Sequence, residues 1–241
     1  MSEEGVRVAA VTGGTRGIGF GVARALVGAG WAVAVGSRSD EAVAAAGAAL
    51  ETEAPGRVFS RVLDVRDRRS CRAFVEETVR HFGRLDTLVN NAGAGRFESI
   101  RDLAHEDWDL QIRTNLDGVF HCSQAAIPHL EGNEEGGWII NIGSISSRTA
   151  IAGGAGYNAS KFGLLGLTEA MMLDLRHQNI RVTIIMPGSV ETPFLGSPPN
   201  PEESWKLRPE DVGRTILDLM RYPAHALPSR IEIRPTRPPR R

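Results

Sequence analysis

The chain has 241 residues, of which 41% are hydrophobic and 24% charged, and its formal net charge is −1 at pH 7. A chain of this length and composition can bury one substantial hydrophobic core, so we expect a single domain over residues 1–241. Its 28 basic residues do not exceed its 29 acidic ones, and no apolar run approaches the roughly 20 residues of a membrane helix. We therefore expect neither a nucleic-acid nor a membrane partner.

Short apolar segments alternate with longer helical segments along the chain. Most of the short segments are nearly continuous runs of Val, Ile, Leu and Ala, which is typical of strands covered on both faces of a parallel sheet. The sixfold alternation predicts a doubly wound α/β fold. The predicted strands are 7–12, 31–37, 57–63, 87–90, 138–142, 181–186 and 231–234, and the predicted helices are 17–29, 40–54, 68–82, 106–130, 157–176 and 209–221.

The last third of the chain contains an irregular segment and a closing segment, and the chain contains two cysteines. Residues 189–207 contain four prolines and no clear periodicity, which predicts a functional lid, and residues 223–241 are expected to close the domain. Cys71 and Cys122 have no metal-ligand spacing around them. We expect two free buried thiols, no metal site and a cytoplasmic location.

The first predicted strand leads into a glycine-rich turn that reads TGGTRGIG over residues 12–19. Glycines at such a turn let the backbone approach a pyrophosphate, which then binds the free N–H groups at the N-terminus of the following helix. The spacing G-x-x-x-G-x-G differs from the usual dinucleotide pattern G-x-G-x-x-G. A purely structural turn therefore remains an alternative.

The second predicted strand ends without the acidic residue that would hold the ribose 2′-hydroxyl of a dinucleotide. Ser37 and Arg38 stand there, and Asp40 falls in the next helix. A hydroxyl and a guanidinium suit a 2′-phosphate, and Arg16 in the glycine-rich turn can reach the same group. The pattern favours NADP(H) over NAD(H); the alternative is that Arg38 is only a solvated residue at a strand end.

Tyr157 and Lys161 share one face of a predicted helix because they are four residues apart. Lowering the pKa of a phenol from ~10 to near neutrality requires about 4 kcal/mol. A cation at ~4 Å supplies about 4 kcal/mol at an effective dielectric constant of ~20. Lys161 can therefore make Tyr157 an acid–base group without a metal ion, and a surface Tyr–Lys pair is the alternative.

Taken together and in this order, the motifs resemble the short-chain dehydrogenase/reductase family, in its single-domain branch. The resemblance covers residues 6–222. It is carried by the glycine-rich turn, Asp64-Val65, Asn90-Asn91-Ala92-Gly93, Asn115, Ser144 before the Tyr157-x-x-x-Lys161 pair, Pro187-Gly188 and Thr192.

The resemblance implies a Rossmann-like, seven-stranded and mostly parallel sheet with helices on both faces, and it implies roles for single residues. Tyr157 would be the acid–base group, and Lys161 would hold the nicotinamide ribose and lower the tyrosine pKa. Ser144 would hydrogen-bond the substrate oxygen, and Asn115 would hold a water in a proton relay. The other implied cofactor positions are Gly13, Thr15, Arg16, Gly17, Ile18 and Gly19 at the pyrophosphate, Ser37 and Arg38 at the 2′-phosphate, Asp64 and Val65 at the adenine, Asn91, Ala92 and Gly93 along the nucleotide, and Pro187, Gly188, Val190 and Thr192 at the nicotinamide carboxamide.

The implied function is transfer of a hydride between NADP(H) and a carbonyl or secondary alcohol. Alternatives are reduction of a 3-oxoacyl thioester on an acyl-carrier protein, a non-catalytic nucleotide sensor, and a nucleotide-sugar epimerase or dehydratase. The C-terminal segment lacks the glycine-rich ending of many fatty-acid-synthesis relatives, which weakens the first alternative. A sensor has no need of Ser144, Tyr157 and Lys161 in catalytic register, and epimerases usually have a longer C-terminal part.

The sequence does not name the substrate, but it does predict the pocket walls and an oligomer. The walls are expected from residues 94–97, 146–154 and 189–207, in which Arg96 and Arg148 either bind an anionic substrate or are simply exposed. Relatives pair the helices that correspond to residues 106–130 and 157–176, so we expect a homotetramer or a dimer. Apolar residues beyond one core-facing stripe support this expectation: Leu164, Leu165, Leu167, Met171 and Met172.

Overall fold

The computed structural model describes residues 5–195 and 204–239. Within these residues, seven strands form one sheet in the order β3-β2-β1-β4-β5-β6-β7. Every one of these pairings is parallel, which confirms the predicted Rossmann-like class. The strands are β1 (Val8–Thr12), β2 (Ala32–Ser37), β3 (Val58–Val62), β4 (Thr87–Asn90), β5 (Gly137–Ile142), β6 (Ile180–Pro187) and β7 (Arg230–Ile233).

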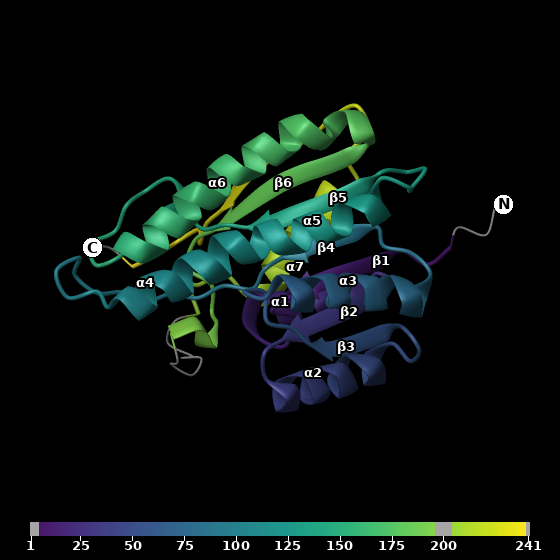
Figure 1. The fold of residues 1–241 in the computed structure, drawn as a ribbon, viewed down its shortest axis with the longest axis horizontal. Helices are drawn as coiled ribbons and strands as arrows, with labels where there is room; N and C mark the ends of the chain where they lie inside the picture. The colour runs from purple at the N-terminus through teal and green to yellow at the C-terminus, as the bar shows by residue number, and fades with distance from the viewer. Residues whose placement is uncertain (1–4, 196–203, 240–241) are drawn as a thin grey trace.

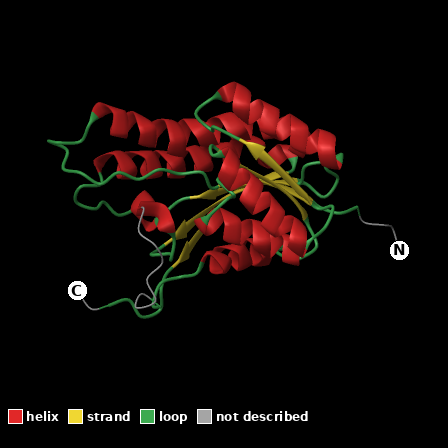
Figure 2. Cartoon of the chain, turned by 90° about the horizontal axis from the view of Figure 1, so that it is seen from below, coloured by secondary structure: helices red, strands yellow, loops and turns green. Residues whose placement is uncertain are grey.

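Helices cover both faces of the sheet (Figures 1 and 2). They are α1 (Gly17–Gly28), α2 (Asp40–Glu53), α3 (Arg68–Phe82), α4 (His105–Ile112), α5 (Gly118–Leu130), α6 (Ala155–Leu175) and α7 (Pro209–Leu219). One core cluster holds the apolar residues of α3, α5 and α6, together with the free cysteines Cys71 and Cys122. The other cluster holds those of α1 and α7.

Alternation of side chains along the strands divides the core in two. Val8 and Ala10 of β1 belong to the first cluster, whereas Ala9 and Val11 belong to the second. Successive side chains of a strand point to opposite faces, so a strand buried on both faces must be apolar throughout. This requirement explains why uninterrupted apolar runs located the strands.

Local signals set the ends of several helices. The Asp67 carboxylate accepts a hydrogen bond from the Arg69 backbone N–H at 2.9 Å, which caps the start of α3. Gly83 ends the same helix at φ 82°, in the left-handed region that glycine adopts without strain. Among the described residues, no helix is both long and apolar enough to cross a membrane.

The predicted helix 106–130 is helical throughout, but its middle contains a π-helical turn that was not expected. Helix α4 ends at Ile112, a π-helical turn occupies Arg113–Asp117, and α5 begins at Gly118. Asn115 lies in this turn and is bonded to residues far away in the sequence. Single π turns often occur at functional sites, which makes this turn a landmark for the site.

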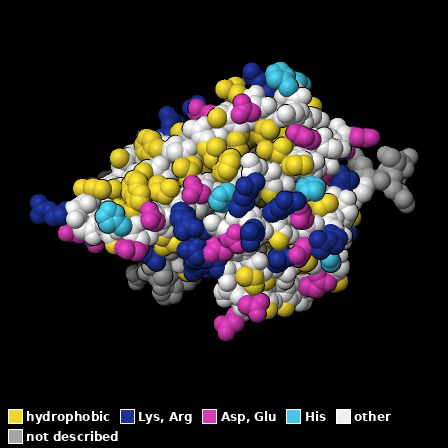
Figure 3. Space-filling model, viewed as in Figure 1, with side chains coloured by type: hydrophobic (Ala, Val, Ile, Leu, Met, Phe, Trp, Pro, Cys, Tyr) yellow, Lys and Arg dark blue, Asp and Glu magenta, His cyan; other side chains and the backbone are white. Residues whose placement is uncertain are grey.

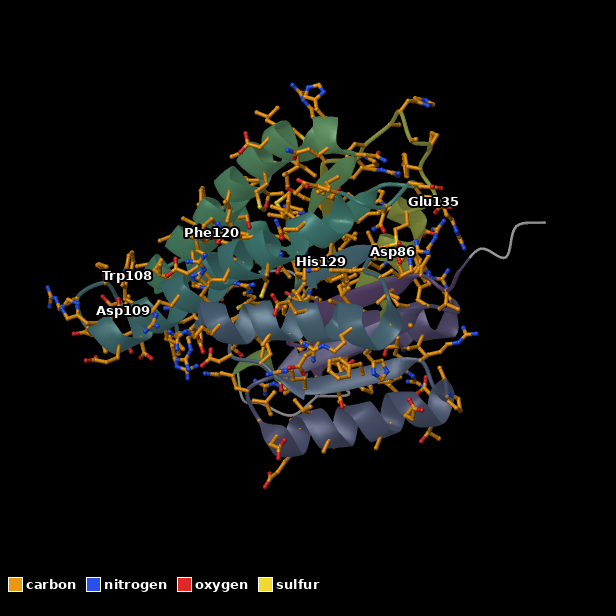
Figure 4. The ribbon with its side chains drawn as sticks, turned by 45° about the vertical axis from the view of Figure 1, so that its right-hand side comes forward. Asp86, Trp108, Asp109, Phe120, His129 and Glu135 are labelled. Carbon is orange, nitrogen blue, oxygen red and sulfur yellow. The ribbon has the colours of Figure 1, made fainter. Side chains whose placement is uncertain are left out.

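The sheet order reverses next to β1, since β1 pairs with both β2 and β4. Doubly wound folds bind ligands at such a switch point, outside the carboxyl ends of the strands. Figure 4 shows which end this is, because Asp86 and Glu135, just before β4 and β5, lie at the opposite end of the molecule from Trp108 and Asp109 of α4. The candidate site therefore lies at the α4 end.

Candidate active site

Glycines at the start of α1 allow the turn to pack closely against the loop after β4. Gly13 and Gly17 have φ of 63° and 53°. A Cβ on Gly13 would lie 2.9 Å from the Ala92 Cα, and one on Gly19 would overlap the Gly13 carbonyl and the Asn91 amide. The predicted glycine positions are therefore required by backbone shape, whatever the ligand.

The loop after β4 is bonded to the end of β1. The Thr12 hydroxyl accepts hydrogen bonds from the backbone N–H groups of Asn91 and Ala92, each at 3.0 Å. The Asn91 side-chain amide donates to the carbonyls of Thr12 and Gly13 at 3.0 and 3.1 Å. These bonds hold two of the predicted nucleotide segments together at the switch point.

The N-terminus of α1 has the features of a phosphate site. Its first turn contains no acidic residue, and Arg16 precedes it without a side-chain cap. Arg16 is exposed, Thr15 and Ile18 are half-buried, and Thr192 lies 3.3 Å from where a Gly17 Cβ would be. Free N–H groups at the positive end of a helix, with no carboxylate in its first turn, fit a pyrophosphate.

An ion pair that the sequence motifs did not indicate orders the expected adenine end. Arg66 donates to both oxygens of Asp64, with distances of 2.6–3.1 Å. This bond is the main reason why the pKa of Asp64 is lowered, with smaller help from the charge of Arg38. Ser37 is half-buried at the end of β2, Arg38 beside it is exposed, and Val65 is buried. The only available signal was that Arg66 lies two residues after Asp64.

Ser144 is fixed by a short capped turn at the carboxyl end of β5. Its hydroxyl accepts from the Ser146 N–H at 3.1 Å, and its own N–H donates to the Ser147 hydroxyl at 3.2 Å. Asn158 of α6 donates to the Ser146 carbonyl at 2.9 Å. The Ser144 hydroxyl is also near enough to Tyr157 to lower the pKa of the phenol, so the structure brings the two residues into one site.

Lys161 lies one turn after Tyr157 on α6, with its Nζ 5.9 Å from the centre of the Tyr157 ring. The ammonium donates to the Ile142 carbonyl at 2.8 Å and is 5% exposed. Burial lowers the pKa of Lys161 to about 8. Burial raises the pKa of Tyr157, and the hydrogen bond with Ser144 opposes this.

The prediction that Lys161 lowers the pKa of Tyr157 is therefore not supported by the structure, in which burial raises that pKa. The ammonium bonds to a backbone carbonyl, and the phenol itself is desolvated. Desolvation disfavours the charged form of either group, so it acts in opposite directions on the two pKa values.

Asn115 links the loop after β4 to α6. Its side chain accepts from the Ala94 N–H at 2.7 Å and donates to the Ala94 carbonyl at 2.8 Å and to the Ser160 hydroxyl at 2.9 Å. Ser160 in turn donates to the Tyr157 carbonyl at 2.8 Å. The side chain thus positions the helix that carries Tyr157, while its role in a water relay stays a prediction.

The segment predicted to meet the nicotinamide follows β6. Pro187 ends the strand, and the Gly188 N–H donates to the Ile233 carbonyl at 2.8 Å. The predicted lid is paired at its two ends, since Val190 forms a bridge with Leu207. Residues 196–203 of the lid lie outside the described part of the chain. On the neighbouring loop after β4, Gly93 is exposed and lies near the Asn115 carboxamide.

The strand order and the glycine-rich turn define a doubly wound α/β protein with its candidate site at the switch point. The short chain dehydrogenase family model matches residues 7–202. A ketoacyl reductase assigned to the monensin polyketide synthase of Streptomyces virginiae is 42% identical over 200 residues, which is 80% of this chain and 74% of that protein.

Two solved structures are similar over nearly the whole chain. An alcohol dehydrogenase from Thermococcus sibiricus, complexed with 5-hydroxy-NADP, has a TM-score of 0.89 and 31% identity and covers 98% of this chain and 100% of its own. A 3-ketoacyl-(acyl-carrier-protein) reductase from Brucella melitensis, complexed with NADH, has a TM-score of 0.86 and 25% identity over 96% of this chain and 98% of its own. The chain belongs to the short-chain dehydrogenase/reductase family, whose enzymes act on carbonyl and alcohol groups.

Proposed function

We propose that this protein is an NADP(H)-dependent oxidoreductase that transfers a hydride between the nicotinamide and a carbonyl or secondary alcohol carbon. The observation that carries the proposal is the meeting of Ser144, Tyr157 and Lys161 at one end of the sheet. The Ser144 hydroxyl is near enough to Tyr157 to lower the pKa of the phenol, and the Lys161 Nζ lies 5.9 Å from the centre of the Tyr157 ring. A proton donor, a second hydrogen-bond donor and a cation are the groups that carbonyl reduction needs.

The bound nicotinamide supplies or accepts the hydride. In the reductive direction the Tyr157 phenol donates its proton to the carbonyl oxygen, which becomes the alcohol oxygen. The Ser144 hydroxyl donates a hydrogen bond to the same oxygen and stabilises its developing charge. Because the pKa of Tyr157 is raised, the phenol is protonated at neutral pH and ready to donate. The ammonium of Lys161, protonated below about pH 8, would hold the nicotinamide ribose.

The preference for NADP(H) rests on charge at the predicted 2′-phosphate. Arg16 and Arg38 are both exposed, and Ser37 stands at the end of β2 in place of a carboxylate. The ligand of the Thermococcus structure is of the NADP type, which supports the preference, whereas the Brucella structure holds NADH. Asp64 and Val65 would meet the adenine, with Arg66 orienting Asp64.

A second candidate function is reduction of a 3-oxoacyl thioester. The names of the Streptomyces and Brucella relatives favour it. The chemistry at Ser144, Tyr157 and Lys161 would be the same, so only the substrate separates this candidate from the broader proposal.

We also infer one domain that assembles as a homotetramer or dimer in a reducing cytoplasm. The first and last strands belong to one sheet, and both thiols are free. Leu164 and Met171, offered from the sequence as interface residues, are buried in the core; the exposed candidates are Phe120, Phe162 and Leu173. Apolar side chains gather over α4, α5 and α6 in Figure 3, and Figure 4 shows Phe120 between these helices.

Light scattering at micromolar concentration tests the assembly. A mass of two or four chains is expected, because so large an apolar face is normally covered. A mass of one chain, about 26.0 kDa, would contradict the inference.

The function is tested by following NADPH oxidation with a panel of uncharged ketones, aldehydes and one 3-oxoacyl thioester. Turnover with at least one carbonyl compound is expected. Tight NADPH binding without turnover of any of them would favour the nucleotide sensor. A thioester turned over far faster than every free ketone would favour the second candidate.

A further inference from the structure

Two phenylalanine rings from distant parts of the chain lie against Tyr157. The ring centre of Phe97, in the loop after β4, is 5.3 Å from that of Tyr157 at an interplanar angle of 54°. The ring centre of Phe194, in the short helix Pro193–Leu195, is 6.0 Å away at 58°. Both arrangements fall within the range of favourable aromatic pairs. The candidate proton donor is therefore flanked by apolar rings.

Gly95 lets the two phenylalanines meet. A Cβ at this position would lie 2.7 Å from the Phe194 Cε1 and 3.2 Å from the Phe97 Cε2. Both rings therefore lie close to the Gly95 Cα, and the side chain of any larger residue at position 95 would displace at least one of them. The loop after β4 and the start of the lid form one apolar wall here.

The two rings are not core residues. Phe97 is 40% exposed and Phe194 is 37% exposed, although each has an aromatic neighbour. Exposed apolar groups that cluster at one place mark a binding surface, whereas single ones do not. Ile151 extends the exposed apolar surface, since its segment is joined to that of Phe97 by the hydrogen bond from the Glu98 N–H to the Gly153 carbonyl.

The arginines of the same walls are already paired. Arg96 lies 3.4 Å from an Asp107 carboxylate oxygen and donates to the Gly95 carbonyl at 3.0 Å. Arg148 donates to Glu232 at 2.9 Å. A substrate carboxylate would have to compete with these acids for either guanidinium, so the walls offer apolar contact in preference to an anion site.

We propose that Phe97 and Phe194 form the binding site for an aryl or similarly flat apolar substituent on the carbonyl carbon, so that the substrates are uncharged aryl ketones or aldehydes. The inference rests on the proposed function, because Tyr157 must be the group that protonates the carbonyl oxygen. An aryl ring held against Phe97 and Phe194 leaves its carbonyl next to the Tyr157 phenol. The two rings thereby act as specificity-determining residues.

The test compares kcat/KM with NADPH for acetophenone, 2-butanone and pyruvate. Acetophenone is expected to exceed 2-butanone by about 100-fold, since each aromatic contact contributes roughly 10-fold. Pyruvate matches 2-butanone in size but carries a charge, and we expect it to be the poorest of the three. An acetoacetyl thioester is the fourth substrate.

Phe97→Ala and Phe194→Ala should each lower kcat/KM for acetophenone by about 10-fold more than they lower that for 2-butanone, so that the ratio of the two values falls by about 10-fold in each variant. Phe97→Tyr keeps the ring and should keep the preference. Ile100→Ala is the matched control, because Ile100 lies in the same loop and is 74% exposed. Circular dichroism of each variant checks folding, and Phe97→Leu replaces the alanine variant if that one unfolds.

The outcomes separate the two claims. Turnover without an aryl preference, faster turnover of pyruvate or of the thioester, or alanine variants that behave like Ile100→Ala would overturn the aryl site and leave the proposed function standing. No turnover of any of the four compounds would reject the proposed function, and the aryl site with it.

Discussion

The two ends of the candidate cofactor site are built from different kinds of residue. At the phosphate end, Arg16 and Arg38 are exposed cations at loop and strand ends. At the catalytic end, Lys161 is buried and bonded to the Ile142 carbonyl. Tyr157 is carried by the α6 helix, which Asn115 and Ser160 position.

Because of this difference, the exposed residues are expected to act mainly on cofactor affinity and the buried residues mainly on the catalytic step. Exposed charges are screened by water and salt, so each adds a modest and adjustable contribution. Buried groups lose hydration, and their pKa values and geometry depend on every neighbour. We therefore expect changes at the catalytic end to be large and changes at the phosphate end to be graded.

The largest effect is expected from Tyr157→Phe. A general acid contributes ~10²–10⁴-fold to the rate, so kcat should fall by that factor, while the dissociation constant for NADPH changes by less than about twofold. Steady-state kinetics and fluorescence titration measure the two quantities. A variant that keeps more than a tenth of the wild-type kcat would mean that another group donates the proton.

Lys161→Met should remove activity. It should also raise the stability of the folded chain at neutral pH, because it removes a buried charge. The pKa of Lys161 is lowered from 10.5 to about 8 in the folded chain, so the unfolded state binds more protons between these pH values and stability rises with pH across them. Below about pH 8 the buried charge costs about 3 kcal/mol. Loss of the bond to Ile142 offsets roughly 1 kcal/mol of this.

Urea unfolding of the cofactor-free protein measures this effect. Lys161→Met should be about 2 kcal/mol more stable than wild type at pH 7, and the advantage should vanish near pH 10.5. Arg72→Met, at a residue paired on the surface with Glu76, is the control and should change stability little. A Lys161→Met protein less stable than wild type at pH 7 would show that the ammonium is not destabilising.

At the phosphate end, Ser37→Asp combined with Arg38→Ala should reverse the cofactor preference. Two charge-assisted contacts, discounted for exposure, leave about 2–3 kcal/mol in favour of NADPH, or roughly 30- to 150-fold. The double variant adds a repulsive carboxylate and removes a cation. The ratio of kcat/KM for NADPH to that for NADH measures the effect. A wild-type ratio near one would mean that Ser37 and Arg38 only end a strand and do not select the cofactor.

The smallest effect is expected from salt. Raising sodium chloride from 50 to 500 mM should increase the KM for NADPH by several-fold and leave kcat nearly unchanged, because only the exposed arginines are screened. An equal response of the KM for NADH would show that the 2′-phosphate is not what the arginines bind.

The sheet and its helices were predictable because their signals are local. Short apolar segments, most of them nearly continuous, located all seven described strands to within about two residues, and the glycine-rich turn was placed correctly between β1 and α1. The π-helical turn was not predictable, since it depends on bonds from Asn115 to Ala94 and Ser160. Those partners meet only after folding.

The site shows the same limit. The meeting of Ser144 and Tyr157 followed from motif order, but the direction of the Tyr157 pKa depends on burial. Residues 94–97 and 189–207 were expected as walls of one pocket, but the packing of the Phe97 and Phe194 rings near Gly95 has no signal in the spacing of the residues. Leu164 and Met171 are buried in the core. Helical periodicity alone does not show whether such apolar residues face the core or an interface.

The most direct test of the account is isotopic. NADPH carrying deuterium at the transferable position of its nicotinamide is incubated with the protein and a ketone that it turns over, and the alcohol is examined by mass spectrometry. The account predicts one deuterium on the carbinol carbon with the wild-type protein, and no alcohol above background with Tyr157→Phe. Unlabelled alcohol, or no alcohol from any carbonyl compound while NADPH stays bound, would contradict hydride transfer at this site.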